Sequence, residues 1–291
     1  MIVPGCCLRF RFILVKDRQK KNYYFLPVSL ILLAFVLTGC GMLSPFSRNP
    51  HFIYEDGALL VDGSDQPIEV INNPGAADVS YAQLLQFIRE DPTDQIKYVS
   101  RGADTGEKAF VCSDFAEAVH NYAESAGIRA GYASIDWEDG QIGHAIDAFE
   151  TTDQGLVYID CTGKSLYSQI EDSEDGAAGS WDKVAYVETG KKYGVIGLDY
   201  ARSPLYSYFV EYDLKWQKFR EELAAYNADV KRYNQEIAGK TFRKGSPELA
   251  RIENWEARLK EQEQELNALS AEIGSSRFKP LGIVKNINVH W

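Results

Sequence analysis

Cysteine and histidine are scarce in this chain, which has five cysteines and four histidines among 291 residues. So few thiols exclude a small domain built on several disulfides. The histidines have no paired spacing and form no H-E-x-x-H motif, so the sequence predicts no metal site. A glycine loop of the phosphate-binding kind is absent as well, and we expect no cofactor.

Long apolar runs are also lacking. The most apolar segment, residues 25–36, has about a dozen residues, whereas a membrane-spanning helix needs about 20. Basic residues precede this segment, and residues 37–40, which read Leu-Thr-Gly-Cys, follow it. The arrangement resembles a bacterial lipoprotein signal peptide over residues 1–39, in which Cys40 would carry lipid as the first mature residue. An uncleaved anchor helix is the alternative.

The signal peptide predicts a lipoprotein outside the cytoplasmic membrane, on the cell surface or on the periplasmic face. Residues 40–50 combine proline, serine and glycine without hydrophobic periodicity. Such a segment is typical of a short tether. We therefore expect the lipid on Cys40 to hold a folded core close to the membrane.

Positive charge is in short supply beyond the signal peptide. The whole chain has a formal charge of −11, yet six of its 31 lysines and arginines and only one of its 42 acidic residues lie in residues 1–39. The remainder therefore has a formal charge of −16. An acidic surface repels phosphate groups, which argues against nucleic acid as a partner and against electrostatic binding to anionic lipid. Contact with the membrane is expected only through the lipid on Cys40.

Hydrophobic periodicity predicts an α+β core. Apolar residues recur at helical spacing between 81 and 88, and a second helix is predicted from about 113 to 126, with Ser113 or Asp114 as its cap. Alternating patterns between turn signals predict strands at about 129–137, 143–150, 156–161, 182–187 and 194–198. Strands joined by such short turns are typical of an antiparallel sheet.

The C-terminal third follows a different period. Apolar residues step by alternating threes and fours from 212 to 237 and from 252 to 273, which is typical of a coiled coil. Residues 239–245 interrupt the pattern and Ser246-Pro247 restarts a helix, so residues 203–278 predict an antiparallel coiled-coil helical hairpin. The tail alternates like a strand, which makes the hairpin an insertion in a core of residues 51–200 and 281–291.

Three residues with complementary chemistry lie along the core. Cys112 begins the second predicted helix, His144 lies in a predicted strand, and Asp160 ends the next strand. Thiolate is the attacking form of cysteine, so a nucleophilic site needs a base beside the sulfur and a group that orients the base. If the two strands pair about a turn centred near Thr152, His144 lies opposite Asp160 and both face one side of the sheet.

Each of these residues alone has a simpler explanation. Cysteine near a helix start is usually a packing residue, a strand histidine is usually structural, and Asp160 could begin a turn. Cys161 could form a disulfide with Cys112 in an oxidising compartment. A disulfide would silence the nucleophile, however, and we expect Cys161 to be a buried strand residue. The joint arrangement favours a catalytic site.

These segments resemble the transglutaminase-like cysteine peptidase superfamily, and more closely its lipid-anchored or secreted prokaryotic members. The resemblance rests on Val-Cys112-Ser-Asp-Phe-Ala, Gly-His144-Ala and Tyr-Ile-Asp160, and it covers about residues 78–198. It implies a papain-like α+β core with Cys112 as nucleophile, His144 as general base and acid, and Asp160 as the group that orients His144. The candidates for a side chain that stabilises the oxyanion are Trp137 and Trp181.

Two functions follow from this pattern. The first is a thiol enzyme that hydrolyses or transfers an amide or peptide acyl group of a protein or peptide substrate. The family includes cross-linking enzymes, hydrolases and inactive scaffolds, so the resemblance does not choose the reaction. The alternative is a non-catalytic surface adaptor that binds a protein partner through the coiled-coil hairpin. The complete set of three groups favours the enzyme.

Overall fold

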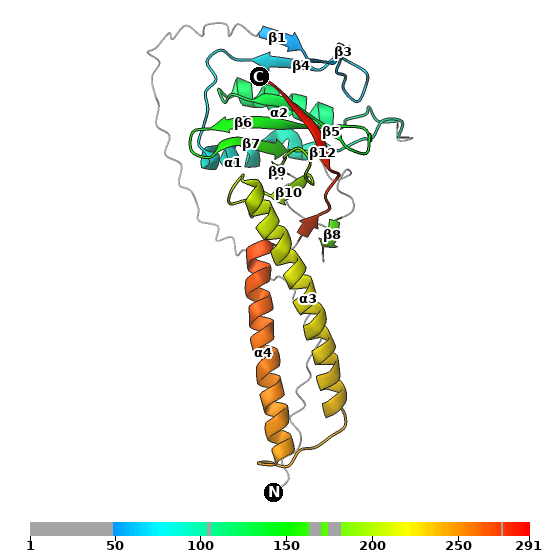
Figure 1. The fold of residues 1–291 in the computed structure, drawn as a ribbon, viewed down its shortest axis with the longest axis vertical. Coiled ribbons are helices and arrows are strands. Elements are labelled where there is room, and N and C mark those ends of the chain that lie inside the picture. The colour runs from blue at the N-terminus through cyan, green and yellow to red at the C-terminus, as the bar shows by residue number, and fades with distance from the viewer. Residues whose placement is uncertain (1–48, 104–105, 163–169, 174–181, 275) are drawn as a thin grey trace, which may run out of the picture.

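The structure is a computed structural model that describes residues 49–103, 106–162, 170–173, 182–274 and 276–291. The predicted signal peptide, Cys40 and most of the predicted tether lie outside the described residues. Within them the chain has a mixed α and β fold with antiparallel sheets (Figure 1), in agreement with the predicted α+β class. None of the helices in these ranges has both the length and the apolar character that a membrane crossing requires.

A six-stranded antiparallel sheet forms the centre of the core, in the order β10-β9-β7-β6-β5-β12. Alternation along the sequence predicts five of its strands to within two residues at each end. The tail of the chain supplies the sixth, which pairs with β5 at one edge. The six strands are β5 (Gly131–Trp137), β6 (His144–Thr151), β7 (Gly155–Asp160), β9 (Lys183–Tyr186), β10 (Gly194–Gly197) and β12 (Val284–His290).

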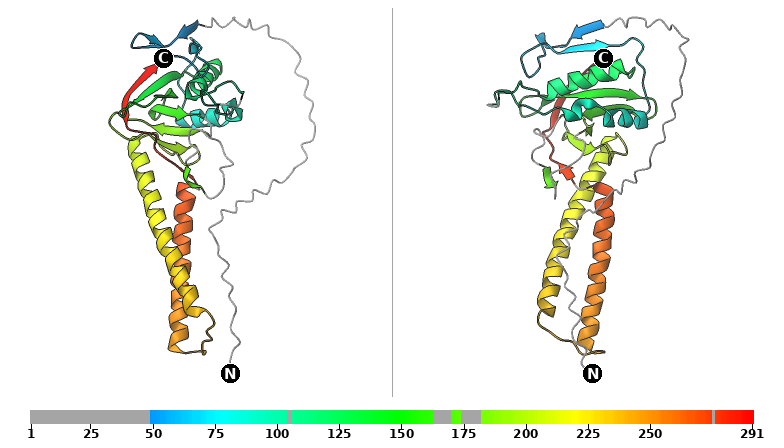
Figure 2. Two further views of the ribbon diagram at one scale, coloured as in Figure 1. Left: turned by 90° about the vertical axis from the view of Figure 1, so that its right-hand side faces the viewer. Right: turned by 180° about the vertical axis from the view of Figure 1, so that it is seen from behind.

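Two helices cover one face of this sheet (Figure 2). They are α1 (Tyr81–Arg89) and α2 (Cys112–Ser125), and their apolar sides share one buried cluster with β6, β7 and β9. A ribbon of β1 (Asn49–Phe52) and β4 (Glu69–Asn72) contacts the other side of α2. The helix that begins at Cys112 is therefore held between the ribbon and the sheet (Figure 1).

Shorter elements complete the core. Two small antiparallel ribbons and one 3-10 helix connect its larger parts, and they are β2 (Tyr54–Glu55) with β3 (Ala58–Leu59), β8 (Ile170–Ser173) with β11 (Ser276–Phe278), and η1 (Pro92–Gln95).

Two long helices extend from the core. α3 (Tyr206–Ile237) and α4 (Pro247–Ile273) lie side by side and run in opposite directions (Figures 1 and 2). The 32 residues of α3 span about 48 Å at about 1.5 Å per residue. On α4 the buried residues recur at intervals of seven, at Ile252, Leu259, Leu266 and Ile273. The seven-residue period of the sequence thus corresponds to the face that packs against the neighbouring helix.

The base of this helix pair belongs to the core. Phe209, Tyr212 and Trp216 of α3 and Ile273 of α4 are buried in the same cluster as the apolar residues of β9 and β10. The hydroxyl of Tyr212 donates to the carbonyl oxygen of Ile273 at 2.6 Å, which joins the two helices at this end. The remainder of the pair projects away from α2 (Figure 1). The helix pair therefore leaves the start of α2 uncovered.

The space around Gly194 of β10 shows how closely the helix pair packs against the sheet. A Cβ atom at Gly194 would lie 2.3 Å from the ring of Phe209, whereas one at Gly197 of the same strand would meet no atom within 4 Å. We expect Gly194→Ala to lower the free energy of unfolding by about 1–3 kcal/mol, because the added methyl displaces Phe209. Gly197→Ala should change it by less than about 0.5 kcal/mol. Urea unfolding measures both, and equal stabilities would contradict the close packing.

Candidate active site

Cys112 is the first residue of α2, and the start of this helix depends on Asp114. The sequence favours Ser113 or Asp114 as the cap, but this is wrong: the cap is Val111, whose side chain makes no capping hydrogen bond. Asp114 lies in the first turn, where its Oδ2 accepts the N–H groups of Val111 at 3.0 Å and Gly63 at 2.8 Å. A carboxylate there satisfies main-chain donors and is favoured by the helix dipole.

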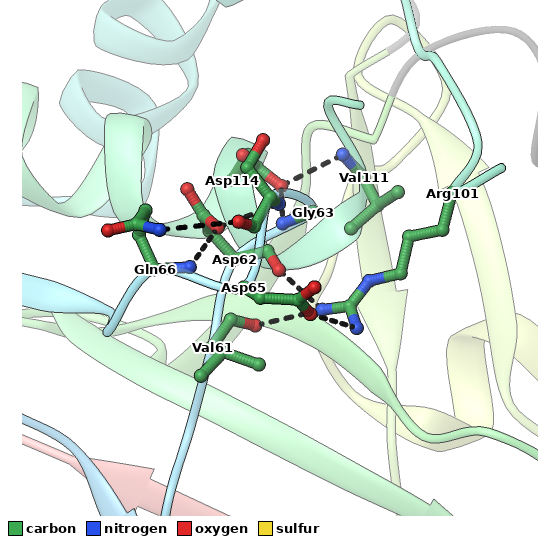
Figure 3. Close-up of polar contacts among 9 residues, drawn as sticks. Val61, Asp62, Gly63, Asp65, Gln66, Arg101, Val111 and Asp114 are labelled. Atoms are coloured by element: carbon green, nitrogen blue, oxygen red, sulfur yellow. Dashed lines mark hydrogen bonds and ion pairs between the residues drawn. The ribbon is translucent and has the colours of Figure 1, made fainter. Parts of the chain in front are cut away.

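The loop at residues 61–66 is fastened to this first turn (Figure 3). Asp62 Oδ1 accepts two N–H groups of the same loop at 2.7 Å, which closes the loop on itself. Arg101 holds the loop from the other side: its Nη1 lies 3.1 Å from Asp65 Oδ1, and its Nη2 donates to the carbonyl oxygen of Asp62. These contacts attach the N-terminal part of the core to the helix start at Cys112.

His144 and Asp160 meet at the end of the sheet. His144 is the first residue of β6 and Asp160 is the last residue of β7. His144 Nε2 lies 2.9 Å from Asp160 Oδ2, and both side chains are almost fully buried. A histidine held at one ring nitrogen by a carboxylate has a fixed orientation and a defined tautomer. The structure thus joins these two of the three predicted site residues by a hydrogen bond.

The pairing of the two strands differs from the predicted register. Asp147 pairs with Ile159 and Thr151 with Gly155, so the turn is centred on Asp153 rather than Thr152. His144 consequently lies diagonal to Asp160 instead of directly opposite. Because the total shift is two residues, both side chains still belong to the same face of the sheet. The expectation of a shared face survives although the expected pairing was wrong.

Cys112 completes the group. The His144 side chain and the Ala145 N–H lie near enough to its thiol to influence its pKa. Burial alone would raise the pKa of Cys112, but the hydrogen bond and the charge of His144, together with the Ala145 N–H, bring the pKa below its usual value. Burial likewise would lower the pKa of His144, but the charge and hydrogen bond of Asp160, followed by Cys112, raise it to about 10. Both shifts are in the direction that favours a thiolate beside an imidazolium.

Asp160 is fully buried and surrounded by hydrogen-bond donors. Besides His144, its Oδ2 accepts the Tyr193 hydroxyl at 2.6 Å, while its Oδ1 accepts the Thr162 N–H at 2.9 Å and lies 3.9 Å from Lys183 Nζ. The sequence analysis missed Tyr193 and Lys183. The sequence pattern could have identified Lys183, because a charged residue at the start of an apolar strand is unusual. We recognise no sequence pattern that identifies Tyr193.

Trp137 does not fill the role that the resemblance suggests. Its indole Nε1–H donates to the carbonyl oxygen of Ile142 at 3.0 Å, so it is not directed at a substrate oxygen. Its ring instead stacks on the His144 imidazole, with centroids 6.4 Å apart and planes inclined by 19°. Trp181, the other candidate, lies outside the described residues. The main-chain N–H of Cys112 is the remaining candidate for an oxyanion donor, because the first N–H groups of a helix have no partner within it.

Comparison of the chain with protein-family models, curated proteins and solved structures gives no match. In the described part of the chain, no group of three or more His, Cys, Asp or Glu side chains is arranged to hold a metal ion. The side chains of the site are therefore the features of this protein that indicate its function.

A second buried aspartate, Asp147 of β6, shows what the donors around Asp160 accomplish. Asp147 is 1% exposed, and among the described residues neither of its carboxyl oxygens has a hydrogen-bond partner. Burial, followed by the negative charges of Asp91 and Asp160, raises its pKa well above the usual value. Burial without donors therefore favours the protonated form of Asp147, whereas the donors around Asp160 favour its ionised form.

This difference predicts a pH dependence of stability. The pKa of Asp147 is raised in the folded state, so the unfolded chain releases its proton near pH 4 while the folded protein keeps it. The associated stability is present below about pH 4 and is lost as the pH rises toward the folded pKa. Asp147→Asn should remove this dependence and become more stable than the original protein by up to about 1.4 kcal/mol per pH unit above pH 4.

Urea unfolding at several pH values between 4 and 8 measures the difference between the two proteins. Asp56→Asn is the control, because Asp56 is exposed in a turn where asparagine fits the same positive φ. A difference for Asp147→Asn that stays constant with pH would mean that Asp147 is ionised in the folded protein.

Proposed function

We propose that this chain is an extracytoplasmic, lipid-anchored thiol enzyme with a papain-like, transglutaminase-like core. It hydrolyses or transfers an amide or peptide acyl group through Cys112, His144 and Asp160. The observation that supports this proposal is the series of thiol, imidazole and carboxylate at the start of α2, in which His144 bonds to Asp160 at 2.9 Å and lowers the pKa of Cys112. Such a series is the arrangement that nucleophilic acyl transfer requires.

The chemistry follows from the positions of the atoms. Asp160 holds His144 Nε2, which leaves Nδ1 for the sulfur of Cys112. The thiolate attacks the carbonyl carbon, and the oxyanion that forms is stabilised by the Cys112 N–H at the positive end of the helix dipole. The imidazolium then gives its proton to the leaving amine, the carbon–nitrogen bond breaks, and a thioester remains on Cys112.

The second half of the reaction regenerates the thiol. His144, now neutral, removes a proton from water or from an acceptor amine, which attacks the thioester carbonyl. The carbon–sulfur bond breaks and Cys112 departs as thiolate, with the proton back on His144. Water as acceptor gives a carboxylic acid, and an amine gives a new amide. The proposed substrates are proteins or peptides near the membrane, and neither half-reaction needs a cofactor.

The helix pair supports a second candidate function. We infer that α3 and α4 form a coiled-coil hairpin, and that an adaptor would bind a partner protein through its distal part. The connection between the helices carries Lys240, Arg243 and Lys244, which are exposed, in a chain whose formal charge is −11. This end lies far from α2 (Figure 1), so binding there would leave Cys112 accessible. An adaptor of this kind would keep its function after Cys112→Ser.

Selective alkylation of Cys112 tests the proposed enzyme. The chain is treated with iodoacetamide between pH 5 and 9, and mass spectrometry measures modification of the peptides that contain Cys112 and Cys161. Cys112 should react at pH 6 about tenfold or more faster than in a His144→Ala variant, since an unperturbed thiol with a pKa of about 8.5 is almost fully protonated there.

Cys161 is an internal control within the same sample. Its side chain is buried, and burial followed by the charges of Asp182 and Asp147 raises its pKa well above the usual value. It should remain unmodified while the protein is folded. If Cys112 reacts only at alkaline pH, with the same profile in the His144→Ala variant, the thiol is not activated and the adaptor becomes the better explanation.

A further inference from the structure

Asp160 receives more donors than the orientation of His144 alone would need. His144 from β6, Tyr193 from the β9–β10 connection and Lys183 from β9 all face its carboxyl group, and the Thr162 N–H adds a fourth donor. The shortest of these contacts is that of the Tyr193 hydroxyl, at 2.6 Å, and it shares Oδ2 with His144. A hydroxyl bond to an ionised oxygen is among the strong hydrogen bonds.

Tyr193 has little freedom to adopt another position. It is fully buried, and its N–H donates to the carbonyl oxygen of Gly282 at 2.9 Å. Its ring meets the rings of Trp137 and His144 edge to face, each with centroids 5.5 Å apart. The same side chain therefore contacts both members of the His144–Asp160 pair, through its ring and its hydroxyl respectively.

Burial has the opposite effect on the charge of a nearby aspartate on the neighbouring strand β6, which lacks such donors. Asp147 on β6, which interacts electrostatically with Asp160, has no hydrogen-bond partner among the described residues, and burial raises its pKa toward the neutral form. If Asp160 were neutral, it would no longer favour the imidazolium form of His144, and Cys112 would lose the cation beside its sulfur. The ionised state of Asp160 is thus a condition for the thiolate.

We propose that Tyr193 is a positioning residue that keeps Asp160 ionised and its Oδ2 directed at His144. This inference rests on the proposed function, since it assigns Tyr193 a part in the same site. The hydroxyl of Tyr193 acts through Asp160 and does not touch the substrate. Lys183, whose ammonium lies near the other carboxyl oxygen, contributes charge on that side.

The test replaces Tyr193 by phenylalanine in the full chain, which keeps the ring and removes only the hydroxyl. Nuclear magnetic resonance of ¹⁵N-labelled histidine reports the charge of His144 during a pH titration. In the original protein His144 should remain imidazolium up to about pH 10. In Tyr193→Phe the loss of imidazolium should occur about one pH unit lower or more, because the proton moves toward the less stabilised carboxylate.

Tyr186→Phe is the matched control. Tyr186 is equally buried, and its hydroxyl donates to the carbonyl oxygen of Ser203 at 2.8 Å, remote from Asp160 in the hydrogen-bond network. This variant loses a buried hydrogen bond of similar length but should leave the His144 titration unchanged. A shift of equal size in both variants would show a general effect of lost stability and would overturn the proposal.

A double-mutant comparison shows whether Tyr193 acts through Asp160. Asp160→Asn should lower the His144 titration strongly, and adding Tyr193→Phe should then lower it little further. Equal effects of Tyr193→Phe with and without Asp160 would contradict the assigned role, as would an unchanged titration in the single variant. The NMR titration reports the charge of His144 and does not depend on the reactivity of the sulfur. If Cys112 proved unreactive, the proposed enzyme would be wrong, but the titration would still test the role of Tyr193.

Discussion

The hydrogen bond between His144 and Asp160 is the interaction on which the rest of the site depends. Both groups are almost completely removed from water, which by itself favours their neutral forms. The bond makes the charged pair stable only because the carboxylate has further donors at both oxygens. Under the proposed function, the lowered pKa of Cys112 would depend on how Asp160 is surrounded, because Asp160 acts on the sulfur through His144.

The antiparallel hairpin of β6 and β7 brings this pair together at small entropic cost. Only a short turn separates the strands, so His144 and Asp160 are 16 residues apart in sequence and joined in space. The alternation of side chains fixes the face on which both lie. Cys112 comes from a separate helix. The hydrogen bonds of Asp114 with the N–H groups of Gly63 and Val111 determine where that helix begins.

The sequence predicted those features that depend on local periodicity. Strands of the central sheet and the start of α4 at Ser246 follow from alternation and capping chemistry. The order of Cys112, His144 and Asp160 along the chain predicts a shared site, and the structure brings His144 and Asp160 into hydrogen-bond contact. The turn centre near Thr152 and the Ser113 or Asp114 cap were wrong by one or a few residues, because several turn and cap arrangements fit the same composition. Tyr193 was missed because its contact with Asp160 spans 33 residues and has no local pattern.

The segment that follows α4 connects the helix pair to the partners of Asp160. The ring of Phe278 lies 5.6 Å from Lys183 Nζ, and the carbonyl oxygen of Gly282 accepts the Tyr193 N–H. Arg277 of the same segment forms an ion pair with Asp213 of α3. A partner bound to the distal helices would therefore affect Cys112 only by moving this short connection, since energetic coupling needs an element with two arrangements that both sites influence. The buried base of the helix pair opposes such movement, so the two candidate functions can operate independently in one molecule.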